Sequence, residues 1–410
     1  MLHVFRWAVP LCLGTALASA GCAQPDSVSA KGGAQLVADS VVILMRHGVR
    51  PPTKAVPLPK STVRDAWPQW SVPPGWLTPH GAQAIGRLAE WDGSELRRDG
   101  LLPAEGCPAA GSVTVIADSD QRTIATADAW ISGALPGCGI ASEHRKQDES
   151  DPAFSPIKSG LVAFDPAKAQ AAVIDAAGPG GIAAVEAAQR PLLERVDAIL
   201  CGDSRTGCGV SARASGIDAP ADGKPGLTGA LDLASTAGQI LVLEYGEGKP
   251  LAEVGWGRAS VDDIAALSAF HALEFRLLAR PRYNALANFA GLAPLVKQGL
   301  SGKAKVTLIV GHDTNVANLG GLLDAHWQVP GLAEDDPAPG GALVLTALHD
   351  KAGHRFVRIA YRSQTLDQIR AAGPLGQQDP YRTVIVPGAC TATGDGTVCP
   401  LAVFEKLAGL

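Results

Sequence analysis

The chain has 410 residues and a formal net charge of −5, with 46% hydrophobic, 18% charged and 5% aromatic residues. This length and balance supply a sizeable hydrophobic core and exclude a chain that is disordered throughout. The negative net charge offers no basic footprint for nucleic acid or for an anionic membrane surface, so any bound anion must be held by local groups. The length fits two ordinary domains or one domain with a large insertion.

The first twenty residues have the pattern of a secretory signal. Arg6 precedes an apolar run from Trp7 to Leu17, and the small residues 18–20 follow it. The run is too short to span a bilayer as a helix, and no later segment approaches about 20 uninterrupted apolar residues. We therefore expect an exported, periplasmic protein without a spanning helix, with the signal peptide covering residues 1–23.

The end of this signal leaves two outcomes open. Ala20-Gly21-Cys22 resembles the end of a bacterial lipobox, although Ser19 stands where that pattern usually has Leu. Cleavage before Cys22 would end the signal at residue 21 and make Cys22 a lipidated first residue, the chain's one membrane attachment. Cleavage after Ala23 would instead remove Cys22 and release a soluble protein.

Six further cysteines follow the signal, an even number that suits an oxidising compartment. They are Cys107, Cys138, Cys201, Cys208, Cys390 and Cys399. Cys201 is close to Cys208 and Cys390 is close to Cys399, which leaves Cys107 to join Cys138. Six cysteines allow 15 connectivities, so these three disulfides are one prediction among several.

Three apolar runs, at residues 41–45, 113–117 and 306–310, are typical of strands covered on both faces. Each run ends abruptly in polar residues: Arg46-His47-Gly48, Asp118 to Arg122, and Gly311-His312-Asp313. Ligands of open α/β sheets bind at the carboxyl ends of the strands, so we expect these polar groups to converge. A helix is predicted from about residue 123 to 135.

The other segments predict an antiparallel extension and a helical insertion. Residues 342–348 and 356–362, joined by a turn around 349–353, form a hairpin pattern. Residues 151–275 are Ala-rich, with helical patterns at 185–200 and 262–278. We expect an α/β fold: a mixed, mostly parallel central sheet flanked by helices, built from 38–150 and 276–410, with a smaller α-helical cap domain inserted at 151–275.

The run from Arg46 to Lys54 reads Arg-His-Gly-Val-Arg-Pro-Pro-Thr-Lys. It places His47 between two arginines on a tight turn, where Gly48 permits close backbone approach. Two guanidinium groups can grip a tetrahedral oxyanion with forked hydrogen bonds while the imidazole faces the phosphorus atom. A solvated surface turn is the alternative, but the five fixed positions would arise by chance only about once in several thousand such chains.

Two motifs, at residues 46–52 and 311–315, resemble the Arg-His-Gly-x-Arg-x-Pro and His-Asp signatures of the histidine acid phosphatases. The resemblance runs from about residue 41 to the C-terminus. Four residues favour the bacterial periplasmic phytase and acid phosphatase branch over the glucose-1-phosphatases: Gly48, Thr53, Lys54 and Thr314. The resemblance implies a phosphoglycerate-mutase-like fold and hydrolysis of phosphate monoesters.

The resemblance also implies roles for individual residues. His47 would be the nucleophile that becomes phosphohistidine, and Asp313 the general acid, which favours turnover at acid pH. Four cationic side chains would bind the transferred phosphoryl group: Arg46, Arg50, Arg122 and His312. Thr53 and Lys54 become candidates for substrate binding. No metal or other cofactor is implied, because the cationic side chains neutralise the phosphoryl charge.

Simpler structural explanations exist for some of these residues. Arg122 could pair with Asp118 or Asp120 at the start of a helix, and His312 with Asp313 could form an ordinary helix cap. His271 lies among apolar residues, so we expect a core or hinge residue there rather than a catalyst.

The expected substrates are small phosphate esters such as phytate, sugar phosphates or nucleotides, and no nucleic acid. The phytase branch has an acidic cap residue in a stretch that corresponds loosely to residues 238–241, where this chain has Gln239. A strict phytate preference is therefore not expected. A glucose-1-phosphatase or another sugar-phosphate-specific phosphatase is the alternative within the class. A noncatalytic periplasmic lipoprotein that binds phosphate esters is the alternative outside it.

Overall fold

The computed structural model describes most of the chain: residues 36–204, 206–218, 223–376, 378–391 and 396–410. Residues 34–410 form one compact unit. The predicted signal sequence and Cys22 lie outside the described residues. In the part of the chain that is described, no single helix is long and apolar enough to cross a membrane; one bent pair, α3 (Pro166–Ala177) with α4 (Gly181–Ala188), passes that test only jointly.

A mixed seven-stranded sheet has the strand order β2-β5-β1-β6-β7-β8, with β9 paired to β7. The strands are β1 (Val37–Arg46), β2 (Val113–Ala117), β5 (Val306–Gly311), β6 (Ala342–His349), β7 (Arg355–Ser363), β8 (Tyr381–Ile385) and β9 (Cys399–Pro400). β5 pairs in parallel with both β1 and β2, and the other pairs are antiparallel. Consequently β1, β2, β5 and β7 point the same way, which confirms the mixed sheet, and β6 with β7 forms the predicted hairpin.

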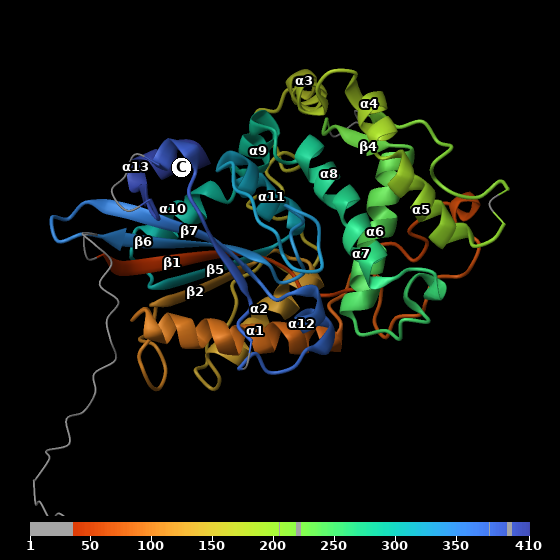
Figure 1. Cartoon of the computed structure of the whole chain (residues 1–410). Coiled ribbons are helices and arrows are strands. Elements are labelled where there is room, and N and C mark those ends of the chain that lie inside the picture. The colour runs from red at the N-terminus through yellow and green to blue at the C-terminus, as the bar shows by residue number, and fades with distance from the viewer. Residues whose placement is uncertain (1–35, 205, 219–222, 377, 392–395) are drawn as a thin grey trace, which may run out of the picture. The chain divides into compact units, whose positions relative to one another are not determined.

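Helices cover both faces of this sheet, with α1 and α2 on one face and α10, α11 and α13 on the other (Figure 1). The helices around the sheet are α1 (Pro79–Arg98), α2 (Gln121–Ala134), α9 (Arg282–Phe289), α10 (Ala293–Leu300), α11 (Asp313–Leu322), α12 (Leu366–Ala371) and α13 (Leu401–Ala408). Short 3-10 turns are η1 (Lys60–Thr62), η2 (Val254–Gly257) and η3 (Gly388–Cys390). Thr78 caps α1 by accepting a hydrogen bond from the backbone N–H of Gly81 at 2.8 Å, and Pro79 opens that helix.

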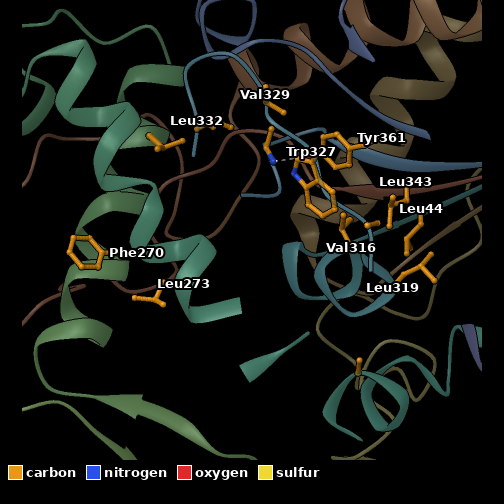
Figure 2. Close-up of a cluster of buried hydrophobic side chains, with 14 of the residues drawn as sticks. Leu44, Phe270, Leu273, Val316, Leu319, Trp327, Val329, Leu332, Leu343 and Tyr361 are labelled. Atoms are coloured by element: carbon orange, nitrogen blue, oxygen red, sulfur yellow. Dashed lines mark hydrogen bonds between the residues drawn. The ribbon is translucent and has the colours of Figure 1, made fainter. Parts of the chain in front are cut away.

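Strand β1 is buried on both faces because its side chains alternate between two cores. Val41, Ile43 and Met45 pack with the α1 and α2 side, whereas Val42 and Leu44 belong to the larger core on the opposite side. Figure 2 shows part of this larger core, including the labelled side chains of Leu44, Val316, Leu319, Leu343, Trp327 and Tyr361. A continuous apolar run is therefore required at β1.

Residues 151–275 are mainly helical, with differences from the expectation. The pattern at 185–200 is two helices, α4 and α5 (Arg190–Cys201), because Pro191 in the first turn of α5 cannot continue α4. The pattern at 262–278 is also two helices, α7 (Val261–Leu267) and α8 (Ala269–Leu278), separated at Ser268, whose hydroxyl donates to the Ala265 carbonyl. The segment also contains α6 (Ala230–Gly246) and a two-stranded sheet of β3 (Gly216–Asp218) and β4 (Gly226–Thr228) that was not expected.

Three disulfides lie in the described residues: Cys107–Cys138, Cys201–Cys208 and Cys390–Cys399. These are the pairs that the short sequence spacings favoured. The bond from Cys390 to Cys399 closes a short loop beside β7, because Cys399 pairs with Val357 in the sheet.

Candidate active site

The polar segments that follow β1, β2 and β5 meet at one edge of the sheet, because these three strands are neighbours. The backbone N–H of His47 donates to the Gly311 carbonyl at 3.0 Å, and that of Asp118 donates to the Val310 carbonyl at 3.0 Å. The His47 and His312 rings lie edge to face with centroids 5.7 Å apart. The predicted convergence of the three strand ends is therefore present.

The turn after β1 requires glycine at position 48. A Cβ atom there would come within 2.9 Å of side-chain carbons of both Leu77 and Ile85, closer than real contacts allow. The backbone N–H of Gly48 also donates to the Thr126 hydroxyl at 3.1 Å. The turn therefore packs closely against α1 and is hydrogen-bonded to α2. These contacts fix the position of the preceding His47.

His47 is buried, with 1% of its surface exposed, and its tautomer is set by the backbone. Its Nδ1 lies 2.8 Å from the Gly48 carbonyl. Because a carbonyl only accepts, Nδ1 carries the hydrogen and Nε2 keeps its lone pair in the neutral ring. Burial, followed by the charges of Arg50, Arg122 and Arg46, lowers the pKa of His47 well below its usual value. The ring is therefore neutral and nucleophilic in mildly acidic solution.

Arg46 and Arg50 bring two positive charges to this imidazole. Arg46 is fully buried, and its guanidinium donates to the Pro337 carbonyl and to Oε1 of Gln239. Arg50 donates to the Pro51 carbonyl at 2.9 Å. Burial and the nearby Arg122 lower the pKa of Arg50 to about 9. Such crowding of cations is unfavourable unless an anion is present to neutralise it.

Arg122 and His312 lie at the same edge of the sheet. Arg122 Nη2 lies 2.6 Å from Oδ2 of Asp120 and 3.4 Å from Nδ1 of His312. His312 Nε2 lies 2.6 Å from Oδ2 of Asp118. The ion pair that offered a simpler explanation for Arg122 is present, yet the same guanidinium also borders the site, so the two interpretations are compatible.

Asp118, Asp120 and His312 are the one group in the described chain with the spacing of metal ligands, since their ligand atoms lie within 4.8 Å of one another. The Arg122 guanidinium already forms an ion pair with Asp120. The carboxylate of Asp118 faces the imidazole of His312. Protein donors thus already neutralise the negative charge that a metal cation would need.

Asp313 is the first residue of α11 and faces Arg46. Its Oδ2 lies 3.1 Å from Arg46 Nη2 and 3.8 Å from His271 Nε2, while Oδ1 accepts from the Thr314 backbone at 2.8 Å. Burial by itself would raise the pKa of Asp313, but the charges of Arg46 and then His271 lower it well below the usual range. The carboxyl group is therefore ionised in the free protein.

A cavity of about 220 Å³ opens beside these groups. One wall carries Arg50 and the exposed Thr53 and Lys54. The opposite wall comes from α6 and α8, including Ser235, Gln239, His271 and Glu274. The cavity therefore lies between the arginine-rich edge of the sheet and two helices, α6 and α8.

A family model for the histidine phosphatase superfamily (branch 2) matches residues 39–199. Phytase AppA of Escherichia coli (strain K12) is 34% identical, covering 93% of this chain and 94% of the relative. The chain belongs to the histidine phosphatase superfamily. Glucose-1-phosphatase of Salmonella typhimurium is 31% identical over 90% of this chain and 91% of its own. The solved structure of Hafnia alvei phytase in complex with tartrate superimposes with a TM-score of 0.86 at 31% identity, covering 92% and 98% of the two chains.

These relatives confirm the predicted family and the predicted class of enzyme, a hydrolase of phosphate monoesters. Relatives exist for both specificities considered from the sequence, phytase and glucose-1-phosphatase. The family and enzyme class therefore no longer depend on the two short motifs alone.

Sequence reasoning misjudged the surroundings of some residues of this histidine phosphatase. His271 is buried and paired with Asp336, as expected of a core residue, but it also lines the cavity and faces Asp313, a neighbourhood that the sequence did not reveal. Glu274 and Asp336 were not singled out. The spacing of three residues between His271 and Glu274 on one helix was an available signal, because it places both on one face. No pattern marked Asp336.

Proposed function

We propose that this protein is an exported acid phosphatase that hydrolyses small phosphate monoesters in two steps through a phosphohistidine at His47. The observation that carries the proposal is the environment of His47: a buried imidazole, held neutral with its Nε2 lone pair available, beside three guanidinium groups. A neutral nucleophile among fixed cations is what attack on an anionic phosphoryl group requires.

In the first step Nε2 of His47 attacks phosphorus and the bond to the ester oxygen breaks. Asp313 gives a proton to the departing oxygen, so that an alcohol rather than an alkoxide leaves. In the second step water attacks the phosphohistidine, the phosphorus–nitrogen bond breaks, and Asp313 takes a proton from that water. Phosphate and the free imidazole of His47 are restored.

Arg46, Arg50, Arg122 and His312 bind the transferred phosphoryl group in this proposal. The Nε atoms of Arg46, Arg50 and Arg122 are buried without a hydrogen-bond partner among the described residues. An oxyanion between the guanidinium groups supplies acceptors for donors of this kind and neutralises their crowded charge. No metal or cofactor is assigned a role in these steps.

The proposed substrates are inositol phosphates such as phytate and, as the second candidate, sugar phosphates. The phytase relative favours the first and the glucose-1-phosphatase relative the second. Gln239 on the cavity wall favours the second, because it differs from the acidic residue of the phytase branch. Nucleotides remain a third candidate. Thr53 and Lys54 are placed to contact parts of the substrate beyond the scissile phosphate.

We further propose that residues 151–275 act as a cap that governs substrate choice, although α8 continues to Leu278, past the predicted boundary. The disulfides and the bacterial relatives support export, and the periplasm is the proposed compartment. The mass of the mature N-terminal peptide would distinguish attachment of a lipid at Cys22 from removal of Cys22 with the signal.

The testing experiment measures phosphate release from p-nitrophenyl phosphate, phytate and glucose 1-phosphate between about pH 3 and 8 in EDTA. We expect activity at acid pH that survives chelation. His47→Ala is expected to lose at least about ten-thousandfold in rate. Asp313→Asn is expected to lose more activity on glucose 1-phosphate than on p-nitrophenyl phosphate, whose leaving group needs less protonation.

Acid quenching during turnover should trap a phosphoenzyme in wild type and none in His47→Ala. A folded wild type that binds phosphate esters but releases no phosphate from any of the three would contradict the proposal and favour the noncatalytic binding protein.

A further inference from the structure

His271 lies between two carboxyl groups in the wall of the cavity. Its Nδ1 is 2.6 Å from Oδ1 of Asp336, and its Nε2 is 3.8 Å from Oδ2 of Asp313. Asp336 is 1% exposed and His271 is 7% exposed, so bulk water does not separate these groups. Because the Asp336 carboxylate accepts, Nδ1 of His271 carries a hydrogen, and the second nitrogen of the same ring is the one that faces Asp313.

The charged and polar groups around His271 come from several elements. They are Arg46 at the end of β1, Gln239 of α6, Glu274 of α8, Asp313 of α11 and Asp336 in the loop before β6. Phe275 covers the ring, with centroids 4.4 Å apart. Burial alone would lower the pKa of His271, but Asp336 and then Asp313 raise it above its usual value, against Arg46. His271 is therefore protonated in the acidic range.

The proposed general acid presents a difficulty that this histidine resolves. Asp313 must hold a proton to give to a leaving group, yet in the free protein the surrounding cations keep it ionised. A phosphate dianion bound at Arg46 and Arg50 offsets those charges and strengthens the affinity of Asp313 for a proton. Nε2 of His271, 3.8 Å from Oδ2 of Asp313, can hold such a proton.

We propose that Asp336 and His271 form a positioning pair that stores a proton and passes it to Asp313 when a phosphate ester binds. This inference rests on the proposed function of the site. The proton moves from Nε2 of His271 to Oδ2 of Asp313, leaving a neutral imidazole. Asp313 passes it to the ester oxygen as the bond to phosphorus breaks. When water hydrolyses the phosphohistidine, one proton of that water returns through Asp313 to Nε2 of His271.

The geometry sets one requirement for this transfer. The separation of 3.8 Å between Nε2 and Oδ2 must shorten by about 1 Å to reach hydrogen-bond distance, a small side-chain adjustment on substrate binding. Asp313 is currently drawn toward Arg46, at 3.1 Å. A phosphoryl group that binds Arg46 competes for this contact and frees Asp313 to approach His271.

The test is Asp336→Asn, which keeps the size of the side chain and an oxygen acceptor for Nδ1 but removes the negative charge. Without that charge His271 loses its proton at lower pH. We expect the alkaline limb of the kcat/KM profile to move about one pH unit or more toward acid, with little change near pH 4. The loss near neutral pH is expected to be larger for glycerol 2-phosphate, whose basic leaving oxygen needs a proton, than for p-nitrophenyl phosphate.

A matched control is Asp39→Asn, because Asp39 Oδ1 lies 2.8 Å from Nδ1 of His349 at the opposite end of β1. This control should leave the pH profile unchanged. A uniform loss in Asp336→Asn at every pH, equal for both esters, would mean a purely structural role and overturn the inference. An inactive wild type would instead contradict the proposed function itself.

A second measurement does not depend on that variant's folding. Histidine-labelled wild type is titrated by NMR, and the His271 signal is identified by its loss in His271→Gln. Adding inorganic phosphate at about pH 5 should convert His271 from the protonated to the neutral form as its proton moves to Asp313. A His271 that stays protonated at saturating phosphate would rule out the transfer.

Discussion

The two walls of the cavity differ in chemistry and in how the chain builds them. The sheet-edge wall contributes Arg50, which lies within five consecutive positions of Arg46 and His47 at the end of β1. The helical wall contributes a hydroxyl, an amide and a carboxyl group from α6 and α8, namely Ser235, Gln239 and Glu274. In the proposed function, the arginines of the first wall bind the phosphoryl group, whereas the second wall faces the group to which the phosphate is attached. Changes at the sheet edge should therefore affect all substrates equally, and changes at the helical wall should alter their ratio.

After the loss of His47 itself, the largest effect is expected for Arg50→Met at the sheet edge. Losing one cation that binds the transferred phosphoryl group should lower kcat/KM roughly a thousandfold for every monoester. Burial and Arg122 already disfavour the charge of Arg50 in the free protein. Thermal unfolding in phosphate-free buffer should therefore occur at the same or a higher temperature than in wild type.

The matched control for that change is Arg87→Met, at an arginine of α1 that pairs with Glu90 outside the cavity. It should retain wild-type rates. If Arg50→Met altered the ratio of phytate to p-nitrophenyl phosphate turnover, rather than lowering both alike, it would be wrong to assign phosphoryl binding to one wall and substrate choice to the other.

The second effect concerns the stability of the helical wall. Glu244 of α6 is fully buried, and Oε2 accepts from the Gly255 backbone at 3.0 Å. Burial raises the pKa of Glu244 to about 7, above the value near 4.5 expected for the unfolded chain. Ionisation of Glu244 therefore favours unfolding, and the loss of folding free energy grows as pH rises from about 4.5 to 7.

Glu244→Gln removes this cost. Its free energy of unfolding should exceed that of wild type by up to about 3 kcal/mol at pH 8 and match it near pH 4. Denaturant unfolding at the two pH values measures the difference, with Glu334→Gln as the exposed control. A variant that is less stable than wild type at pH 8 would show that the carboxylate is stabilised where it lies.

The sheet edge could be predicted from sequence because its determinants are local. A strand buried on both faces must be continuously apolar, so the ends of β1, β2 and β5 were visible as abrupt changes to polar residues. Neighbouring parallel strands then bring His47, Arg122 and Asp313 together without any further information. The requirement for Gly48 also follows from one short turn against α1.

The helical wall could not be predicted in the same way. Helix breaks at Gln189 and Ser268 depend on one proline and one hydroxyl within otherwise continuous helical patterns. The contact of His271 with Asp336 joins residues 65 positions apart in the sequence, one in a helix and one in a loop. An apolar neighbourhood made His271 look like a core residue, and only tertiary packing shows that its ring faces Asp313.

A third effect tests the selectivity of this wall. Burial raises the pKa of Glu274, so the group is neutral in acid and becomes charged as pH rises. A charged Glu274 repels substrates with several phosphates. We therefore compare kcat/KM for phytate with kcat/KM for p-nitrophenyl phosphate in Glu274→Gln. This ratio should rise roughly fivefold at pH 7, the effect expected from removing one repulsive contact between like charges, and should stay unchanged near pH 4.5. Glu253→Gln, exposed and outside the cavity, is the control.

The smallest effect is expected for Lys54→Ala at the cavity mouth. Lys54 is exposed, so it attracts a second substrate phosphate only weakly. Its removal should raise KM for phytate about threefold without changing kcat. Added salt should erase the difference, because exposed charges are screened. Lys60→Ala, exposed but outside the cavity, should change neither constant. An equal loss on p-nitrophenyl phosphate would instead place Lys54 with the residues that hold the transferred phosphoryl group, and the part of this wall that acts on every substrate would then extend past Arg50.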